Sequence, residues 1–254
     1  MITKIKYNSV DYFADLNKPI DISIPIDPEG VLAWGMQPVC IEPVSHAGWI
    51  GDVEKGSAVN FNNIFFNPHA HTTHTECVGH ISSAKESINQ ELKNFFFIAK
   101  LITIKPKKKN NDCVITKNMI QNLVTKQEKL DALIIRTLPN KINKMCYNYS
   151  NSNPPYLLKE AAKYMSDINI KHLLIDLPSI DREKDSGKLN AHKLFWGFPD
   201  TIRHGCTITE LIYADPIIID GYYLLNLQFA PFENDASPSR PVLFQLQKKV
   251  NENR

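Results

Sequence analysis

The middle of the chain alternates between buried-strand and helix patterns, and this alternation constrains the fold most. Residues 131–137 form a short apolar run typical of a strand that is buried on both faces. Pro154 and Pro155 then open a predicted helix that ends near Asp167, with one apolar face made of Leu157, Leu158, Ala161 and Met165. A second apolar run over 172–176 predicts another buried strand. Strands that alternate with helices favour an α/β fold.

Further strand patterns flank this middle region on both sides. Residues 95–104 form a longer run rich in β-formers, and residues 20–26 alternate as a half-buried strand does. In residues 57–66, apolar side chains share one parity with asparagines between them, which indicates a strand with a polar face or a strand that enters a site. The other predicted elements are a helix with Thr116 as its N-cap and two closing strands, over 116–124, 222–229 and 242–247.

The composition is that of a folded domain with an ordinary core. Apolar residues make up 43% of the 254 residues and charged residues 22%. A chain of this length buries about 70–75% of the surface that its unfolded form exposes. No internal repeat and no linker rich in Pro, Gly or Ser divides the sequence. We therefore predict a single α/β domain over residues 1–254, built on a mixed sheet.

Charge, hydropathy and cysteine usage exclude several classes of protein. The balance of 29 Lys+Arg against 27 Asp+Glu leaves a formal charge of +2, too small for a nucleic-acid-binding surface. No apolar run approaches the roughly 20 residues of a membrane-spanning helix, and the first residues lack the apolar stretch of a secretory signal. The five cysteines lie far apart without a C-x-x-C pair, which suits a reducing compartment. We expect a cytoplasmic protein with neither nucleic acid nor membrane as a partner.

The chemistry of this chain concentrates in one cluster of histidines. Four of the eight histidines fall within twelve residues, with Glu76 among them: His69, His71, His74 and His80. Imidazole nitrogens and carboxylate oxygens are the ligands that zinc or manganese takes where thiolates are absent. In an extended segment His74, Glu76 and His80 project from one face. The alternative is a turn whose histidines hydrogen-bond to the backbone. Cys77, inside the cluster, fits buried packing better than the role of a nucleophile.

Residues 74–80 resemble the second half of the motif H-x-G-T-H-x-D-x-P-x-H of the Cyclase family. That family includes bacterial kynurenine formamidase and isatin hydrolase, both metal-dependent amide hydrolases. The resemblance extends from about Asp21 to Val242. Its further parts are an Arg-Thr strand end, a D-x-P-S-x-D segment, two segments with a late histidine and a late glutamate, and a D-x-S-P-x-R turn, at residues 131–137, 174–181, 190–195, 207–210 and 235–240. Motifs that recur in the same order argue against a chance match.

Carried over residue by residue, the motif places metal ligands in this segment. His74 matches the second histidine of the motif, and Glu76 stands where the family has an aspartate. Glutamate keeps the carboxylate and reaches about one methylene further. Ala70 occupies the position of the first histidine, so His69 or His71 has to substitute for it. We prefer His69, which follows a proline at the expected entry of a loop.

The same resemblance implies the remaining roles. His80, the last histidine of the motif, would act as general base and then as general acid. A first ion, zinc or manganese, would be held by His69, His74 and Glu76. Glu76 would bridge to a second ion on His192 and Glu210, so that one or two ions bind, and Glu210 would also take part in catalysis. The residues alone leave alternatives open: His192 as a helical histidine that faces solvent, Glu210 as a surface charge, and His204 as a competing ligand.

The resemblance also implies a fold and an activity. The fold is a swivelling β/β/α-type domain around a mixed sheet or partial barrel, assembled as a homodimer or a higher homo-oligomer. The activity is hydrolysis of a C–N amide bond in a small-molecule substrate, an aryl formamide or a cyclic amide, by metal-activated water. Two alternatives stay open, a lyase or ring-closing enzyme on the same metal site and a non-catalytic protein that binds a metal or a small ligand. Candidates for an aromatic wall, although each fits a core position better, are Trp49, Phe65, Phe66 and Trp196.

Overall fold

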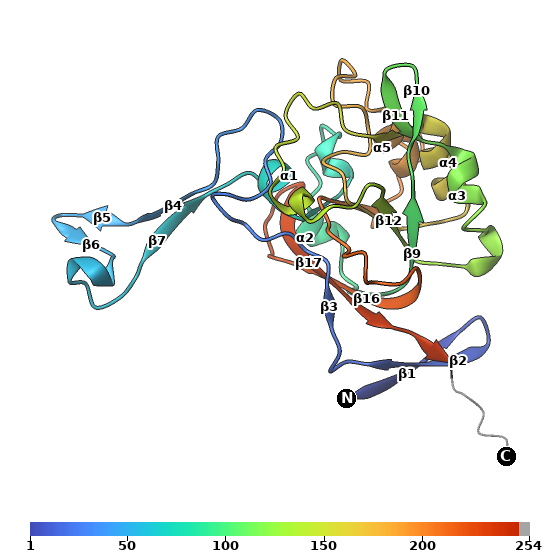
Figure 1. Cartoon of the computed structure of the whole chain (residues 1–254), viewed down its shortest axis with the longest axis horizontal. Helices are drawn as coiled ribbons and strands as arrows, with labels where there is room; N and C mark the ends of the chain where they lie inside the picture. Colours follow the sequence, from blue (N-terminus) through green and yellow to red (C-terminus); the bar gives the residue numbers. More distant parts are fainter. Residues whose placement is uncertain (249–254) are drawn as a thin grey trace.

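Seven strands close into a ring at the centre of the computed structural model, which describes residues 1–248 (Figure 1). Around the ring the order is β16-β9-β12-β14-β15-β8-β17, and pairing of β17 with β16 closes it. Neighbours from β9 to β15 are parallel, and all other neighbours are antiparallel, so the prediction of a mixed sheet is confirmed. The seven strands are β8 (His74–Glu76), β9 (Phe96–Ile104), β12 (Ala132–Thr137), β14 (His172–Ile175), β15 (Thr207–Glu210), β16 (Gly221–Phe229) and β17 (Ala236–Gln245).

Strand β12 shows why a continuous apolar run occupies the middle of the barrel. Side chains alternate across a strand. Leu133 and Ile135 therefore join the core between the barrel and its helices, whereas Ala132 and Ile134 join the core inside the barrel. A strand that is covered on both faces needs an apolar side chain at nearly every position. The strands predicted from the patterns over 95–104, 131–137, 172–176 and 222–229 are confirmed.

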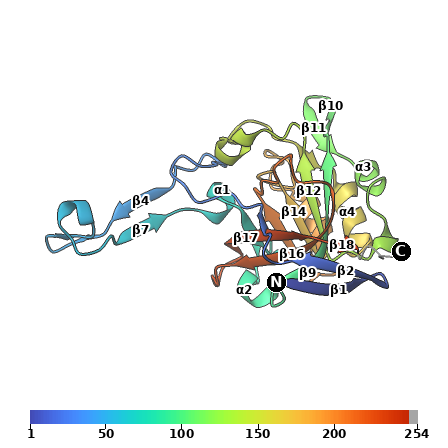
Figure 2. The same cartoon turned by 60° about the horizontal axis from the view of Figure 1, so that its bottom comes forward.

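Three helices pack on the outside of the barrel, α3 (Lys117–Gln121), α4 (Lys159–Asp167) and α5 (Asn190–Trp196) (Figures 1 and 2). α4 buries Ala161 and Met165 in the outer core. The prediction that this helix begins at Pro154 was wrong. The prolines instead lead into β13 (Tyr156–Leu157), which pairs with β11 (Asp112–Ile115) and thereby uses Leu157 in a strand.

The remaining elements of the described chain are short. The strand predicted over 20–26 is formed only at β3 (Ile20–Asp21), which pairs with the outer edge of β17. The closing strand predicted over 242–247 is the last part of β17, except that β17 ends at Gln245. None of the helices in residues 1–248 has the length and apolar character that crossing a bilayer requires. The other elements are β1 (Ile2–Tyr7), β2 (Val10–Asp15), β10 (Lys107–Lys109), β18 (Gln247–Lys248), α1 (Pro68–His71), α2 (Ile88–Glu91) and the 3-10 helices η2 (Val78–His80), η3 (Lys126–Glu128) and η4 (Ile142–Cys146).

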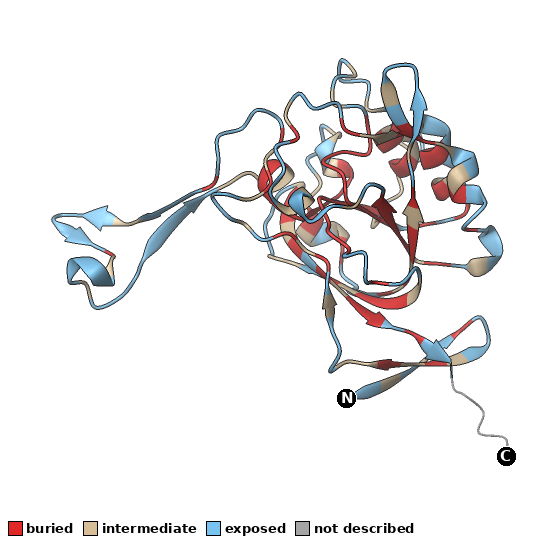
Figure 3. Cartoon of the chain, in the orientation of Figure 1, coloured by how far each residue is buried: buried red, intermediate tan, exposed pale blue. Residues whose placement is uncertain are grey.

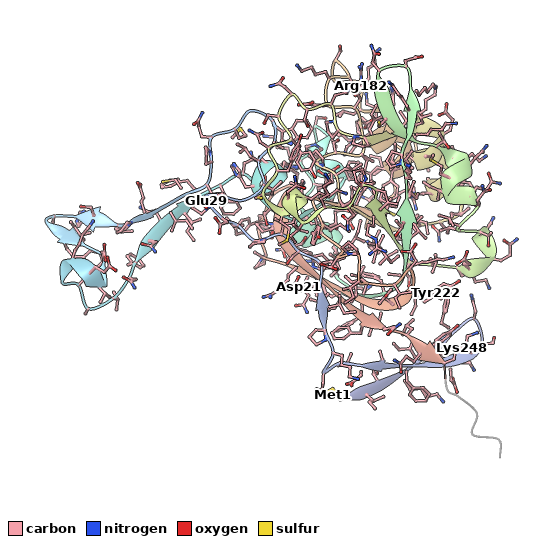
Figure 4. All side chains as sticks on the ribbon, in the orientation of Figure 1. Met1, Asp21, Glu29, Arg182, Tyr222 and Lys248 are labelled. Atoms are coloured by element: carbon pink, nitrogen blue, oxygen red, sulfur yellow. The ribbon has the colours of Figure 1, made fainter. Side chains whose placement is uncertain are left out.

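Residues 40–66 project from the barrel as a long hairpin, which we call the arm (Figure 1). The arm is exposed along nearly its whole length, in contrast to the barrel, whose interior is filled with side chains (Figures 3 and 4). Its strands are β4 (Cys40–Pro43), β5 (Ser45–His46), β6 (Trp49–Ile50) and β7 (Asn62–Phe65), with the 3-10 turn η1 (Val53–Lys55) near the tip. The parity pattern over 57–66 thus belongs partly to β7, which leads back toward the histidine cluster but is not half-buried.

Candidate metal centre

Strand β8 forms the floor of the histidine cluster. His74 and Glu76 are two residues apart on this strand, so their side chains project from the same face, and both are fully buried. The antiparallel register of β8 with β15 sets Glu210 directly opposite His74, and the His74 Nε2 to Glu210 Oε2 distance is 3.6 Å. The closed barrel therefore brings together two residues that lie far apart in the sequence.

Helix α1 adds His69 to this floor. Asn67 caps the helix by accepting a hydrogen bond from the backbone N–H of His69. The His69 Nδ1 atom lies 3.3 Å from Glu76 Oε2, and Nε2 lies 2.9 Å from Asp235 Oδ2. His71, by contrast, uses both ring nitrogens in contacts with backbone groups of Asn67 and Gln37. The structure therefore brings His69 into the cluster and leaves His71 outside it.

His80 reaches the cluster from a turn and not from the strand. β8 ends at Glu76, and residues 78–80 form η2, so the expectation of one extended face from His74 to His80 was wrong. The turn is tight because Gly79 passes so close to Glu86 that a Cβ atom would lie 1.9 Å from the Glu86 carbonyl oxygen. The His80 Nδ1 atom lies 3.1 Å from Asp235 Oδ2.

His192 enters from the first turn of α5. Asp181 accepts hydrogen bonds from the backbone N–H groups of Ala191 and His192 and from His192 Nδ1 at 2.7 Å. The His192 Nε2 atom then lies 3.2 Å from Glu76 Oε1 and 3.6 Å from Glu210 Oε1. Burial opposes a charge on this imidazole, but the hydrogen bond that it donates to Asp181 and the nearby glutamates hold its pKa well above the usual value.

Three histidines share one arrangement. His69, His74 and His192 each have one ring nitrogen against an outer acceptor, which is Asp235, the carbonyl oxygen of Thr72 or Asp181. The other nitrogen of each ring faces Glu76 or Glu210, and in the neutral tautomer that these contacts favour it would offer its lone pair to a metal. Histidine ligands of metals are typically oriented in this way by an outer acceptor.

The buried floor leaves polar atoms poorly paired. Among residues 1–248, His74 Nε2 is fully buried without a hydrogen-bond partner, and the buried Glu76 Oε2 faces only the rings of His69 and His80. An unpaired buried polar atom costs roughly 1–3 kcal/mol. Their neighbours supply a complete donor set, since ligand atoms of His69, His74 and Glu76 lie within 4.8 Å of one another, as do those of Glu76, His80 and His192. Nitrogen and oxygen donors at this spacing fit a divalent metal such as zinc or manganese.

Electrostatics in the cluster favour a cation. Burial opposes a charge on His69, but hydrogen bonds to Asp235 and Glu76 raise its pKa to about 10. Burial also opposes ionisation of Glu76, yet the charge of His80 and contacts with the other histidines hold the pKa of this carboxyl well below its usual value. A protonated His69 beside an ionised Glu76 is the arrangement that a bound metal would replace, with release of the proton.

A cavity of about 350 Å³ opens above the cluster. Trp34 forms part of its wall and donates a hydrogen bond from Nε1 to the carbonyl oxygen of His69, with a φ of +61° that is uncommon for a tryptophan. The aromatic residues expected at this wall lie elsewhere. Trp49 and Phe65 are on the arm, Phe66 stacks near Phe232, and Trp196 is buried beside His192. The cavity lining consists of Trp34, Met36, Asn67, His69, His80, Ser179, Leu189, His192 and Glu210.

The structure tests the alternative roles that the sequence left open for His192, Glu210, His204 and Cys77. His192 and Glu210 are buried, so neither is a surface residue. His204 is exposed and contacts Glu91, away from the cluster. Cys77 is buried with its thiol on the carbonyl oxygen of Glu86, and burial raises its pKa to about 12, which disfavours a reactive thiolate.

The sequence did not single out Asp235, Asp181 or Trp34 as members of the site. Asp235 and Asp181 stand in segments that resemble family motifs, and those segments are the signal that could have marked them. No local pattern marks Trp34, because its place depends on the loop that leads to the arm.

Comparison with known proteins shows the family to which the chain belongs. The family model described as "Putative cyclase" matches residues 20–182. The chain belongs to the Cyclase family. Kynurenine formamidase of Bacillus mycoides (strain KBAB4) is 25% identical over 229 residues, which cover 88% of this chain and 96% of that protein. Kynurenine formamidase of Bacillus cytotoxicus is 26% identical over 233 residues, with 89% and 97% covered.

Solved structures show that the Cyclase family fold is shared. A "predicted metal-dependent hydrolase" from Bacillus stearothermophilus matches with a TM-score of 0.63 at 20% identity, covering 89% of this chain and 98% of that one. An isatin hydrolase bound to the product analogue thioisatinate matches with a TM-score of 0.59 at 15% identity, covering 91% and 93%. At these identities the likeness shows the fold, and the predicted swivelling, barrel-like architecture is confirmed.

Proposed function

We propose that this chain is a metal-dependent hydrolase that cleaves a C–N amide bond in a small substrate, an aryl formamide or a cyclic amide. The observation that carries the proposal is the common orientation of His69, His74 and His192, each held by an outer acceptor and directed at Glu76 or Glu210. Kynurenine formamidases among the relatives support the amide bond as the target. The enzyme acts as one domain over residues 1–254, in the cytoplasm, as a homodimer or a higher homo-oligomer.

The position of each site residue determines the role that we propose for it, either to bind the metal or to orient a ligand. His69, His74 and Glu76 would hold one zinc or manganese ion, and His192 and Glu210 would complete the site or, with Glu76, hold a second ion. A divalent ion supplies Lewis acidity, polarising the amide carbonyl and making water acidic enough to attack at neutral pH. Asp181 and Asp235 orient the histidine rings that they contact.

We assign the proton transfers of the reaction to His80. Asp235 lies against His80 Nδ1, which leaves Nε2 to take a proton from the attacking water. The water oxygen forms a bond to the carbonyl carbon, and the C–N bond breaks. His80 then returns its proton to the leaving nitrogen, so one water is consumed and an acid and an amine are formed. His80 suits this part because it lines the cavity and its side chain is 31% exposed, whereas His74 is fully buried.

The wall of the cavity suits a flat substrate. Trp34, Met36 and Leu189 provide apolar surface next to the histidines, and the cavity of about 350 Å³ admits a single-ring compound. We propose Trp34 as the aromatic surface for an aryl group, in place of the aromatic residues that were expected from the sequence.

The proposal is tested by combining metal counting with an oxygen label. Chain purified without an affinity tag is analysed for zinc and manganese and is then incubated with N-formyl arylamines and cyclic amides in ¹⁸O-water. A hydrolase carries one or two metal ions per chain and places the label in the carboxyl product. A lyase or ring-closing enzyme gives a product without the label, and a chain that neither contains nor binds metal contradicts the proposal.

A His80→Gln variant separates catalysis from binding. Its turnover is expected to fall by about 10²–10⁴-fold while its metal content is unchanged. His204→Gln is the matched control, because His204 is an exposed histidine outside the cluster. If the His80→Gln and His204→Gln variants had equal turnover, the proposed role of His80 in catalysis would be wrong.

A further inference from the structure

A second cavity lies on the side of the barrel that faces away from the arm (Figures 1 and 2). Strand β10, the first residues of α4 and the loop over 181–189 surround it, and its volume is about 430 Å³. Small-molecule sites typically have volumes of about 300–1,000 Å³. None of the residues that line it also lines the cavity above the histidines. The protein therefore has space for a second small ligand.

Cationic side chains from separate segments converge on this cavity. Lys109 ends β10, and Lys159 begins α4. Lys184 and Lys188 stand on the loop, and all four lysines are exposed. Within residues 1–248, none of the four forms an ion pair, although other lysines do. Like charges around one cavity repel one another, and an anion between them would relieve that repulsion.

Arg182 adds a guanidinium group to the same cavity (Figure 4). Its Nη2 atom donates a hydrogen bond to Asp112 Oδ1 at 3.1 Å. Within the described residues, Nε and Nη1 donate none. A guanidinium presents five N–H donors in a planar fork that matches the oxygens of a phosphate group. Arg182 therefore keeps donors that a ligand could use.

The acidic side chains of the cavity are mostly engaged by the protein itself. Asp181 accepts hydrogen bonds from two backbone N–H groups and from His192 Nδ1. Asp185 accepts hydrogen bonds from two backbone N–H groups of its own loop. Only the carboxylate of Glu160 lacks such a partner among residues 1–248. Five cationic side chains and three acidic ones thus leave the cavity positive, which favours an anionic ligand.

The start of α4 adds backbone donors next to these charges. Leu158 stands at the N-cap and supplies no side-chain hydrogen bond, so the N–H groups of the first helical residues lack partners. The N-terminal end of a helix carries a partial positive charge. Tyr156 and Leu157 line the cavity beside this end and give it an apolar wall. The cavity thus combines donors for an anionic group with a surface for a carbon skeleton.

We propose that this cavity binds the phosphate group of a small phosphorylated compound. A phosphate monoester carries a charge of about −1.5 to −2 at pH 7 and three strong acceptor oxygens. It can therefore use several of the cationic groups and N–H donors at once, whereas a single carboxylate has two oxygens and one charge. The organic part of the ligand contacts Tyr156 and Leu157. The proposal does not depend on the hydrolysis of an amide bond.

Asp181 connects the proposed phosphate site to the metal centre. Its side chain lines the second cavity and also accepts the hydrogen bond from His192 Nδ1 at 2.7 Å. His192 lines the cavity above the histidines. A ligand in the second cavity therefore contacts the loop that orients His192 without entering the cavity above the metal centre.

Isothermal titration calorimetry on the full chain tests the proposal with three probes, which are adenosine 5′-monophosphate, adenosine and inorganic phosphate. We expect adenosine 5′-monophosphate to bind with a Kd at or below about 1 mM, and more weakly as the ionic strength rises. Adenosine, which lacks the phosphate, should not bind at the same concentrations. Inorganic phosphate should bind more weakly than the monophosphate. Equal affinity of these two would overturn the assignment to a phosphorylated compound and favour free phosphate.

A Lys159→Gln/Lys188→Gln variant locates the binding. Its Kd for adenosine 5′-monophosphate is expected to rise at least about 10-fold. Lys18→Gln/Lys126→Gln is the matched control, because it removes the same charge from two exposed lysines outside the cavity and should bind as the wild type does. Far-UV circular dichroism checks that each variant is folded.

Amide hydrogen exchange gives a second measurement on the wild-type chain. Exchange over residues 157–162 and 182–190 is expected to slow when adenosine 5′-monophosphate is added. A Kd that Lys159→Gln/Lys188→Gln leaves unchanged would overturn the proposal, since phosphate held at the metal centre would not depend on these lysines. The absence of any binding of the two phosphates at about 10 mM would overturn it as well.

Discussion

The floor and the rim of the metal centre contain the same residue types in different surroundings. On the floor, the side chains of His74, Glu76 and Glu210 are no more than 4% exposed, whereas those of His69 and His80 on the rim are 20% and 31% exposed. The floor residues stand on paired barrel strands, and the rim residues stand on short helical turns. Strand register holds a side chain more precisely than a turn does. We infer that the floor, together with His69, would hold a metal ion and that the more exposed His80 would meet the substrate.

The floor also explains why a metal would stabilise this protein. Glu76 and Glu210 are two carboxylates buried within one site, and among residues 1–248 the groups that form ion pairs with them are histidines. Removing one partner of a buried charge pair is strongly destabilising, so the carboxylates and their partners act as a unit. A ligand that binds only the folded state raises its stability by mass action.

The largest expected effect follows from removing the central carboxylate of the floor. Glu76→Gln keeps the size of the side chain but removes the charge that faces three histidines. We expect metal affinity to fall by more than about 100-fold, since outer-shell partners alone are worth 10–100-fold. Competition with a chelator of known affinity measures the change, and Glu160→Gln is the control, because Glu160 is an exposed residue of α4 outside the cluster. An unchanged metal affinity would contradict the prediction that the metal binds at the floor.

An intermediate effect is expected from changing Asp181, which accepts a hydrogen bond from the outer ring nitrogen of His192. Asp181→Asn keeps one acceptor oxygen but weakens the contact that orients His192. We expect metal affinity to fall by about 10–100-fold, less than for the change at Glu76. Asp185→Asn is the matched control, because Asp185 accepts backbone hydrogen bonds in the same loop without contacting a histidine. Equal loss in both variants would mean that the loop matters only through its backbone.

The smallest expected effect is on the pH dependence of stability and concerns His172, a buried histidine outside the metal site. Burial lowers the pKa of His172 to about 3, and its ring packs on Phe97 with Nδ1 on the hydroxyl of Thr207. Between the unfolded value of 6.5 and about pH 3 the unfolded chain binds more protons, so stability falls as the pH falls. His172→Asn should reduce the loss of unfolding free energy between pH 7 and pH 5 by ~2 kcal/mol.

Urea unfolding at a series of pH values measures that slope. His46→Asn, at an exposed position on the arm, serves as the control and should follow the wild-type curve. Parallel curves for wild type and His172→Asn would show that His172 does not carry the acid sensitivity.

Predictions from local apolar patterns succeeded where the chain is buried on both faces. The runs at β12 and β14 predicted strands because every position of these two strands is buried, and the run at β9 did so although only part of that strand is buried. The pattern over 57–66 predicted a strand with a polar face or a strand that enters a site, and only residues 62–65 of it form a strand, which is exposed, because parity describes which residues share a face and not whether anything covers that face. The prediction of a helix that begins at Pro154 failed for a similar reason. The local pattern did not show that Leu157 would pair with β11 as part of a strand.

The sequence by itself determined the donor set of this protein, because imidazole and carboxylate groups concentrated between His69 and His80 have few common uses other than binding metal. The tertiary structure decided which nitrogen of each ring points inward and which distant carboxylates stand behind the rings. Asp181 and Asp235 reach the site only through barrel closure and the docking of α5. Both are long-range events, and local sequence patterns carry no record of the register that produces them.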